Sequence, residues 1–378
     1  MSFSFEVLQN DPTGARRGKL ATPHGDIETP FFMPCGTAGT VKGLTQDALE
    51  ELGAGILLAN TYHLYLRPGH ELIRRLGGLH AFMAWRGAIL TDSGGYQVFS
   101  LSELRKVTDE GVRFRSHLDG SEHLLTPEKA VEIQLALGSD IAMVLDECIE
   151  TPAPRNVAEA ALKRTTEWAC RGRNVFLQCA KRDGDPAQWQ FGIVQGATFA
   201  DLRRESARQL LALEFPGYAI GGLAVGEPHG VTCEMTAEVT ALLPQGRPRY
   251  LMGVGRPEQL ADYVARGIDM MDCVLPTRAA RHACLYTSEG RVLIKNARYI
   301  EDQRPIDPNC SCSVCRRYTR AYLRHLFVAG EITAAILATH HNVCFYLDIM
   351  RQIREAITFG HLANFATELR ARYVAGPA

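Results

Sequence analysis

Eight short apolar runs recur along the chain, and each gives way to polar or glycine residues before a helical pattern begins. Near-continuous apolar character is typical of strands that are covered on both faces, as in a parallel sheet. Eight such strands alternating with helices predict an α/β fold, a (β/α)8 barrel. In chain order, the runs lie at residues 30–37, 55–62, 88–95, 141–148, 191–196, 218–223, 250–255 and 268–275.

The helical pattern between the runs is clearest at residues 126–138. Thr126 is a favourable N-cap, Pro127 fits the first helical turn, and Gly138 follows the last apolar position. These signals predict a helix between Thr126 and Gly138. Similar helices are expected at residues 45–53, 157–172, 200–213 and 257–267.

Three parts of the chain do not follow the strand–helix repeat, and they define its predicted domains. Residues 1–29 read as extended, turn-rich chain, and about 97–126 form an insertion whose VRFRSHLDG stretch alternates like one strand of a hairpin. A basic, cysteine-bearing segment follows the last apolar run. We therefore expect a barrel domain over 1–276 that includes the extended segment and the insertion, a metal-binding subdomain over 277–345, and a C-terminal helical segment over 346–378 that packs on the barrel.

Charge and cysteine content narrow the class of protein. The formal net charge is −1, yet residues 277–330 carry ten Arg and Lys against four Asp and Glu, a local +6 that leaves −7 elsewhere. A basic segment on a neutral protein suggests a local anion-binding face. The 11 cysteines are odd in number and mostly scattered, the N-terminus has no apolar signal segment, and no apolar run approaches the ~20 residues of a membrane helix. We expect a reduced, cytoplasmic protein.

Three cysteines lie within six residues in the stretch NCSCSVC, at Cys310, Cys312 and Cys315. Thiolates at this spacing favour zinc, which takes four ligands in a closed structural site. Neighbouring helical residues point about 100° apart, so only one of two adjacent histidines is expected to reach the metal. The alternative is a set of free surface thiols. The stretch ATHHNVCFYL supplies the candidates for a fourth ligand, His340, His341 and Cys344.

Polar residues and glycines gather at the ends of the apolar runs. In a (β/α)8 barrel the active site lies at the carboxyl ends of the strands. One carboxylate there could attack as a nucleophile while another carries protons, as in retaining glycosyl transfer. Each such Asp could equally be a helix N-cap, and Tyr96 and Met252 could be ordinary core residues. The strand-end residues are Asn60, Asp92, Asp146, Gln195, Gly221–Gly222, Gly253–Gly255 and Asp272.

A series of motifs runs in order from near residue 3 to the C-terminal helices: TDSGGYQVFSL, VLDEC, GIVQG, IGGLAVGEP, LMGVG, DCVLPTR and CSCSVCRRYTRAYLRHL followed by HHN. Together they resemble the bacterial tRNA-guanine transglycosylases, the queuine tRNA-ribosyltransferase family. The resemblance implies an irregular (β/α)8 TIM barrel with a C-terminal zinc-binding subdomain that contacts RNA. It implies a pentosyltransferase that exchanges guanine at the tRNA wobble position for 7-aminomethyl-7-deazaguanine (preQ1) in queuosine biosynthesis.

The resemblance also implies roles for individual residues. Asp272 would attack the ribose C1′ and leave a covalent enzyme–RNA intermediate, while Asp92 would be the general acid/base. The Gly222 N–H would bind the carbonyl oxygen of the base, and the Leu223 C=O would receive the aminomethyl group. No redox or nucleotide cofactor is implied. The base pocket would be formed by Asp146, Cys148, Gln195, Gly222 and Leu223, with Tyr96 and Met252 enclosing the ring.

The partners implied are the anticodon loop of a tRNA, preQ1 and a second copy of the chain. Thr277, Arg278 and Arg281 would contact RNA, and one structural Zn²⁺ per subunit would be held by Cys310, Cys312, Cys315 and His341. His341 is preferred because the ligand in the family precedes Asn. The candidates for RNA or dimer contacts beyond the cysteines are Arg316, Arg317, Arg320, Arg324, Tyr318, Tyr322 and His325.

Details of the motifs indicate a subclass and one departure. Cys148 and Val225 match the bacterial enzymes, whereas eukaryotic queuine-using relatives have a smaller residue in place of Val225. His282 and Ala283 stand where an Asn-Gly pair is common in the family, which puts local RNA contacts in question but not the chemistry.

Three alternative functions are weighed against this one. A non-catalytic RNA-binding subunit on the same fold would lack Asp272 or Asp92, and both are present. A zinc-dependent barrel hydrolase would need histidines and carboxylates as metal ligands at the strand ends, which carry few histidines. Archaeosine-type exchange elsewhere in the tRNA would bring extra C-terminal RNA-binding domains that we do not find in this sequence.

Overall fold

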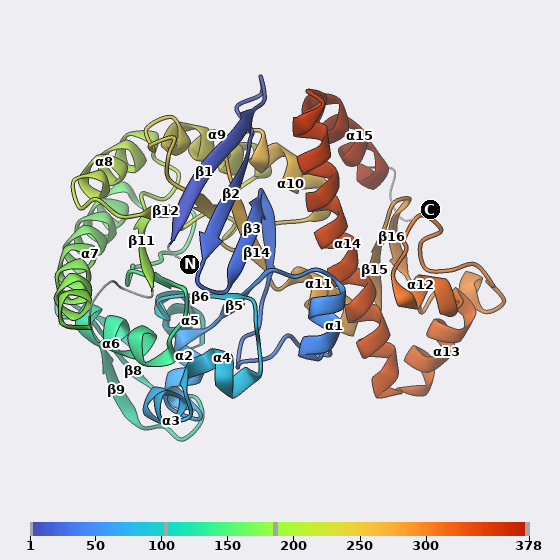
Figure 1. Ribbon diagram of the computed structural model, residues 1–378, viewed down its shortest axis with the longest axis horizontal. Helices are drawn as coiled ribbons and strands as arrows, with labels where there is room; N and C mark the ends of the chain where they lie inside the picture. Colours follow the sequence, from blue (N-terminus) through green and yellow to red (C-terminus); the bar gives the residue numbers. More distant parts are fainter. Residues whose placement is uncertain (1–2, 102–104, 184–187, 375–378) are drawn as a thin grey trace.

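The eight predicted strands are present and form one parallel sheet that nearly closes into a barrel (Figure 1). The computed structural model describes residues 3–101, 105–183 and 188–374. The strands are β4 (Phe31–Pro34), β5 (Ile56–Ala59), β6 (Ala88–Thr91), β10 (Ile141–Met143), β11 (Trp189–Val194), β12 (Gly217–Ile220), β13 (Arg249–Leu251) and β14 (Met270–Cys273). Their order is β4-β14-β13-β12-β11-β10-β6-β5, and an isolated parallel bridge between Cys35 and Leu58 joins β4 to β5. The predicted irregular (β/α)8 barrel is confirmed.

Helices cover the outside of the barrel and follow most of its strands. Between Thr126 and Gly138 the predicted helix is confirmed: the Thr126 Oγ1 accepts a hydrogen bond from the Lys129 N–H at 3.1 Å, and Gly138 takes a left-handed φ of 68°. The helices are α1 (Gln46–Glu51), α2 (Thr61–Leu66), α3 (His70–Arg75), α4 (Gly78–Met83), α5 (Gly95–Leu101), α6 (Pro127–Leu137), α7 (Arg155–Asp183), α8 (Ala200–Leu211), α9 (His229–Thr240), α10 (Pro257–Val264) and α11 (Leu275–Arg281).

Helix α7 is longer than the pattern at residues 157–172 predicts. Gly172 reads as a C-cap in the sequence, but the helix passes through it and continues to Asp183. A Cβ at Gly172 would lie 3.6 Å from Val131 Cγ2 and 3.7 Å from the Pro127 carbonyl oxygen, both on α6. The glycine therefore marks a close approach of two helices rather than a helix end.

The N-terminal segment forms a three-stranded antiparallel sheet over the amino ends of the barrel strands. Its strands are β1 (Ser4–Asn10), β2 (Arg16–Thr22) and β3 (Gly25–Thr29). Phe3 stacks on Trp189 at the start of β11 with 4.8 Å between ring centroids, and Arg16 pairs with Asp269 just before β14. Because this sheet covers the amino ends of the strands, a substrate-binding site is expected at their carboxyl ends.

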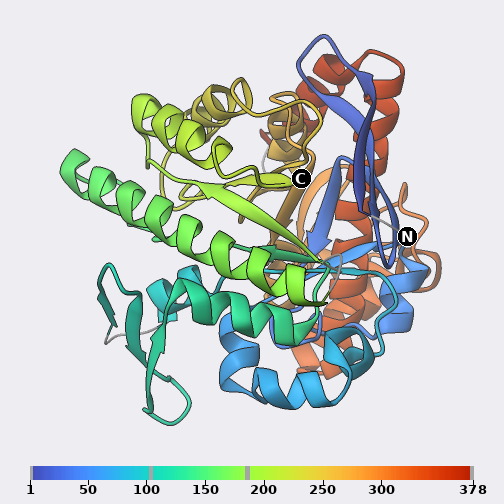
Figure 2. The same ribbon diagram turned by 60° about the vertical axis from the view of Figure 1, so that its left-hand side comes forward.

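The insertion after the third barrel strand is a small antiparallel sheet, drawn in teal at the lower left of Figure 2. Its strands are β7 (Arg105–Val107), β8 (Val112–Arg115) and β9 (Glu122–Leu125). Val112 and Phe114 are buried and alternate with exposed arginines, as the predicted hairpin strand requires. Residues 102–104 of the expected insertion lie outside the described residues.

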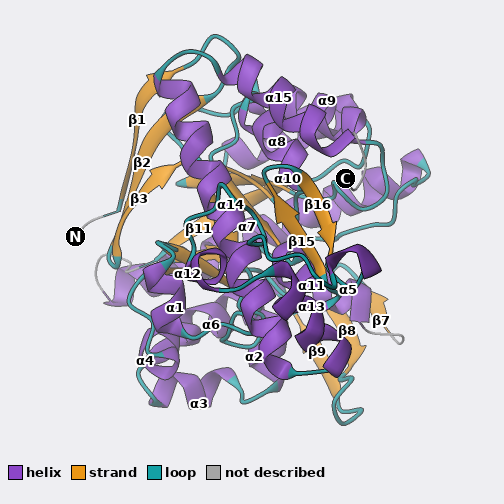
Figure 3. Cartoon of the chain, turned by 90° about the vertical axis from the view of Figure 1, so that its right-hand side faces the viewer, coloured by secondary structure: helices purple, strands orange, loops and turns teal. Residues whose placement is uncertain are grey.

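The chain after α11 forms a second packing unit beside the barrel (Figures 1 and 3). It contains β15 (Cys284–Thr287), β16 (Gly290–Leu293), a 3-10 helix (Ala297–Tyr299), α12 (Ser313–Arg317), α13 (Arg320–Ala329), α14 (Ile332–Thr358) and α15 (Leu362–Val374). It has its own apolar cluster, which includes Leu285, Ile294 and Leu323. Helix α14 crosses the boundary proposed at 345/346, so the division into domains remains a prediction, and residues 375–378 lie outside the described part. In the described residues, no helix has the length and apolar character needed to span a membrane.

Candidate functional site

Asp272 lies at the carboxyl end of β14 in a nest of hydrogen-bond donors. Its Oδ1 accepts a hydrogen bond from the Tyr250 hydroxyl at 2.5 Å and from the Gly253 N–H at 2.8 Å, and its Oδ2 accepts from the Cys35 thiol at 3.4 Å. The residue is only 8% exposed. Burial raises the pKa of Asp272, while the hydrogen bonds from Gly253, Tyr250 and Cys35 oppose that rise. The donors come from β13 and its end and from the end of β4, the two strands that flank β14 in the barrel order.

Asp92 follows β6 and is equally well enclosed. Its Oδ1 accepts from the Thr61 N–H at 2.9 Å and the Gly94 N–H at 3.2 Å, and its Oδ2 accepts from the Asn60 side-chain amide. Burial raises the pKa of Asp92 to about 6, and the negative charge of Asp272 adds to the rise.

Asp92 and Asp272 therefore share one electrostatic environment at the mouth of the barrel. A carboxyl group with a pKa of about 6 exchanges its proton readily near neutral pH, as a general acid/base must. Asp272, like Asp92, accepts three hydrogen bonds that favour its ionised form and oppose the effect of burial. The two carboxyl groups differ in the donors that surround them.

A third buried carboxylate, Asp146, lies after β10 and is paired with an amide. Its Oδ2 accepts from Gln195 Nε2 at 2.6 Å, and its Oδ1 accepts from the Ser93 hydroxyl at 3.2 Å. Burial raises the pKa of Asp146 to about 6. Cys148 is buried near this carboxylate, and burial raises the pKa of its thiol to about 12, so the thiol stays protonated at neutral pH.

Gly221 and Gly222 lie against this pair. A Cβ on Gly221 would lie 2.8 Å from Gln195 Nε2, and one on Gly222 would lie 2.2 Å from Gln195 Oε1. No side chain fits at either position without moving Gln195, and Gly222 also takes a left-handed φ of 62°. Glycine therefore brings the backbone directly to the candidate pocket.

The remaining predicted pocket residues lie around the same strand ends. Leu223 is 4% exposed, whereas Met252 is half-buried beyond β13. Tyr96 on α5 is 50% exposed, which leaves its ring available to a ligand. That Tyr96 and Met252 enclose a base stays a prediction.

The predicted RNA-contacting residues follow Asp272 directly on α11. Arg278 and Arg281 are exposed, and Arg281 Nη1 donates to the Thr277 carbonyl at 3.0 Å. Thr277 itself is 5% exposed, and its hydroxyl donates to the Val274 carbonyl at 3.3 Å. The two arginines thus place positive charge beside the mouth of the barrel.

The candidate arginines beyond the cysteines are not equivalent. Arg320 is 4% exposed, donates to the Ile306 carbonyl and pairs with Asp302, so it holds its own subdomain together and does not face RNA. Arg316 and Arg317 are exposed. Tyr318 and Tyr322 stack with 5.5 Å between ring centroids, and Tyr322 is exposed.

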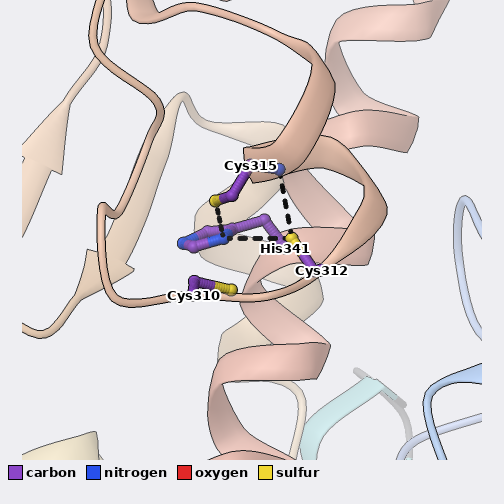
Figure 4. Close-up of side chains that lie close together, drawn as sticks. All are labelled: Cys310, Cys312, Cys315 and His341. Atoms are coloured by element: carbon purple, nitrogen blue, oxygen red, sulfur yellow. Dashed lines mark hydrogen bonds between the residues drawn. The ribbon is translucent and has the colours of Figure 1, made fainter.

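Cys310, Cys312, Cys315 and His341 come together between α12 and α14 (Figure 4). Their four ligand atoms lie within 4.8 Å of one another. The His341 Nδ1 is 3.8 Å from Cys312 Sγ and 3.3 Å from Cys315 Sγ. Zinc bonds of about 2.3 Å to sulfur and 2.0–2.1 Å to nitrogen, at tetrahedral angles, separate these atoms by about 3.6 Å. The group therefore fits a tetrahedral metal.

A hydrogen bond at Nε2 of His341 determines that the other ring nitrogen, Nδ1, faces the thiols. Its Nε2 lies 2.8 Å from the Tyr286 carbonyl oxygen, so a donated Nε2–H leaves Nδ1 free to act as a ligand. His340 points elsewhere, to the Ser313 hydroxyl at 3.1 Å, as the helical geometry of adjacent residues predicts. Cys344 is half-buried and is not one of the four.

Three buried residues that contact the barrel mouth do not stand out in the sequence: Tyr250 and Cys35 donate to Asp272, and Arg203 donates to the Gly221 carbonyl. Tyr250 lies inside a strand and reads as core, Cys35 reads as a scattered cysteine, and Arg203 lies in the charged stretch of α8. Only the order β4-β14-β13, which brings Tyr250 and Cys35 beside Asp272, would have pointed to the first two.

The fold and the site define a (β/α)8-barrel enzyme with carboxylate side chains at its reacting end. Comparison with known proteins gives the family. The family model "Queuine tRNA-ribosyltransferase" matches residues 11–375. Proteins with the same name from Koribacter versatilis and Solibacter usitatus are 58% and 59% identical, over 95% and 96% of both chains, respectively. One from Geobacillus thermodenitrificans is 55% identical over 98% of this chain and 96% of its own length.

The chain therefore belongs to the queuine tRNA-ribosyltransferase family, a family of pentosyltransferases.

Proposed function

We propose that this enzyme exchanges guanine at the wobble position of tRNA for preQ1, a step in queuosine biosynthesis. The observation that carries the proposal is the pair of buried carboxylates, Asp272 and Asp92, with different hydrogen-bond environments at one barrel mouth. Retaining glycosyl transfer needs one carboxylate nucleophile and one proton carrier.

In the proposed first step, an Asp272 carboxylate oxygen attacks the ribose C1′ of the target nucleotide. A C1′–O bond forms as the C1′–N9 bond to guanine breaks, and Asp92 supplies the proton that the departing base takes up. In the second step Asp92 accepts a proton from preQ1, whose N9 attacks C1′ and releases Asp272. Two inversions restore the original anomeric configuration.

The base would be recognised by the residues around Asp146. Its carboxylate can accept hydrogen bonds from the N–H groups of a guanine-like edge, and the Gln195 amide can add to this contact. The Gly222 N–H would donate to the base carbonyl, and the Leu223 C=O would accept from the aminomethyl group of preQ1. An anticodon loop suits such a pocket because its bases are not locked in a duplex.

We propose that the metal of the Cys3His group is one structural Zn²⁺ per subunit. Three thiolates and an imidazole favour zinc over harder cations, and four protein ligands close the site. Bound zinc would tie α12 to α14 through Cys312, Cys315 and His341.

The remaining proposed contacts concern RNA and a second subunit. Arg278 and Arg281 would bind phosphates of the anticodon loop. Tyr322 and its neighbours on α13 would form part of a homodimer interface. Because the substrate is tRNA, we place the reaction in the cytoplasm.

The test is incorporation of labelled guanine into unmodified wobble-G tRNA, followed by its displacement with preQ1. Wild type should do both, and Asp272→Asn neither. Asp348→Asn, a surface carboxylate on α14, serves as the matched control and should behave as wild type. A well-folded, zinc-loaded wild type without exchange would refute the proposed function and leave an RNA-binding relative.

A further inference from the structure

Arg203 is a fully buried arginine on α8, directly behind the candidate base pocket. Its exposed fraction is 0%, and no carboxylate of the described residues lies within ion-pair distance of it. Its Nε donates to the Ala197 carbonyl at 2.6 Å, both terminal nitrogens donate to the Gly221 carbonyl at 3.1 Å, and Nη2 also lies 3.2 Å from the Gly222 carbonyl. A buried cation without an ion-pair partner is expensive, even though the more distant Glu227 carboxylate favours its charged form, so its position calls for an explanation.

The cost of this burial is visible in the acid–base behaviour of the side chain. Burial lowers the pKa of Arg203 to about 9, which still leaves the guanidinium charged at neutral pH. The chain also makes room for it: a Cβ on Gly196 would lie 2.9 Å from Arg203 Cγ. The cation thus joins the loop after β11 to the loop after β12.

The Gly221 carbonyl is one end of an amide whose other end is the Gly222 N–H. Because a peptide unit is planar and trans, holding the carbonyl oxygen on one side directs the N–H to the opposite side. Hydrogen bonds from a cation also polarise the amide and make its N–H a stronger donor. No described residue accepts a hydrogen bond from the Gly222 or Leu223 N–H, so both remain free for a ligand.

We propose that Arg203 is a positioning residue for base specificity. Its hydrogen bonds to the Gly221 and Gly222 carbonyls fix the direction of the Gly222 N–H and make it a stronger donor, and this N–H selects a purine that carries a carbonyl group. This inference rests on the proposed function, since it takes the base pocket to lie on the far side of the Gly221–Gly222 backbone. A purely structural role as a link between two loops is the competing explanation.

The experiment compares the binding of two free bases to Arg203→Met, Arg203→Lys and wild type. Guanine carries the carbonyl acceptor, whereas 2-aminopurine has a hydrogen in its place; it also lacks the N1–H, but that loss is common to all variants. Dissociation constants for both bases are measured by calorimetry on the zinc-loaded protein. Arg204→Met is the matched control, since Arg204 is the next residue on α8 and pairs at the surface with Glu238.

We expect Arg203→Met to bind guanine about tenfold more weakly than wild type, the effect of about one lost charge-assisted hydrogen bond, with 2-aminopurine binding changed less than about threefold. Arg203→Lys, which keeps the charge but not the planar fork, should fall between them. Arg204→Met should change neither base.

Equal weakening of both bases would overturn the inference, because a structural role disturbs the whole pocket. Unchanged guanine binding would overturn it as well. If Arg203→Met does not fold, the same two-base ratio in Arg203→Lys decides. Labelled-guanine exchange by wild type is measured on the same preparation, and its absence would refute the proposed function. If wild type exchanges guanine but the variants keep the wild-type ratio of the guanine and 2-aminopurine dissociation constants, only the role of Arg203 is refuted.

Discussion

At the scale of single residues, the strand-end rule located the carboxylates but not their partners. Asp92, Asp146 and Asp272 follow apolar runs, so their place at the barrel mouth could be predicted from the sequence. Tyr250 could not, because a tyrosine within an apolar run is normally core, and its contact with Asp272 exists only through strand pairing.

The departure at His282 and Ala283 also acquires a physical meaning. Ala283 takes a left-handed φ of 61°, a conformation that favours glycine, the residue expected here from the resemblance. The alanine keeps the turn despite this cost, and its carbonyl still accepts a hydrogen bond from the Ile294 N–H at 3.0 Å.

Removing the Tyr250 hydroxyl should impair Asp272, the proposed nucleophile. Tyr250→Phe deletes a donor that opposes the upward shift in the pKa of Asp272, so that pKa should rise further. We expect exchange at neutral pH to fall roughly tenfold to hundredfold and the acidic limb of the pH–rate profile to move to higher pH. Tyr373→Phe, a buried tyrosine bonded to the Thr287 carbonyl, is the control. An unmoved acidic limb would contradict the role given to Tyr250.

The buried carboxylate of Asp146 should lower the stability of the folded protein at neutral pH. Its pKa is raised by burial to about 6, so its favourable contribution is present below about pH 4 and is lost as the pH rises through about 6. Asp146→Asn should therefore be more stable than wild type at pH 7.5, by up to about 3 kcal/mol, and similar at pH 4. Thermal unfolding at both pH values checks this.

Asp302→Asn is the control for this experiment, and its expected change in stability at pH 7.5 has the opposite sign. Its hydrogen bond with Arg304 lowers the pKa of Asp302 to about 2, so the substitution should lower the stability at pH 7.5. A loss of stability in Asp146→Asn at pH 7.5 would show that its hydrogen bonds outweigh the burial of its charge.

At the scale of elements, capping residues and apolar runs predicted which helices and strands form but not where each of them ends. The ends of α6 followed from Thr126 and Gly138, whereas α7 continues through Gly172 because tertiary packing overrides a local signal. The short helices α2 to α4 were not expected from the sequence, whereas the equally short α1 was, since its N-cap Thr45 and the following Gly53 mark its ends.

The metal ligands should be essential to the subdomain they join. Cys312→Ser should lose bound zinc and lower the melting temperature, because metal binding and folding are coupled. Cys170→Ser, which alters an exposed cysteine on α7, should retain both. Metal content by atomic spectroscopy and a melting curve provide the measurement. Full zinc occupancy in Cys312→Ser would contradict the ligand set.

The N-terminal sheet should depend on a buried ion pair. Arg16 Nε lies 2.9 Å from Asp269 Oδ1, and the side chains are 3% and 0% exposed. Arg16→Met should destabilise the protein by about 3–5 kcal/mol, since it leaves Asp269 buried and unpaired.

The double variant Arg16→Met/Asp269→Asn should recover much of that loss. Lys19→Met, which breaks an exposed pair on the same strand, should change little. Equal effects of Arg16→Met and Lys19→Met in urea unfolding would show that the buried pair has no special weight.

At the scale of the whole molecule, the two ends of the barrel differ: one end is covered by a sheet, and the other carries the candidate site. The sheet β1–β3 covers the amino ends of the strands, and the candidate site and α11 occupy the carboxyl ends. The basic segment near the C-terminus lies next to the site only because α11 follows β14 directly, a neighbourhood that the sequence order already predicts. Which arginines face outward was not predictable, as buried Arg320 shows.

The most direct test of the account is to locate the covalent enzyme–RNA bond. The enzyme is mixed with excess wobble-G tRNA without free base, quenched in acid, digested with ribonuclease and trypsin, and analysed by mass spectrometry. We predict a ribose-linked fragment on the peptide 267–278, localised by fragmentation to Asp272 and not to Asp269, which pairs with Arg16 at the opposite end of the barrel. A bond to Asp92, or active enzyme that forms no covalent adduct, would contradict the central claim.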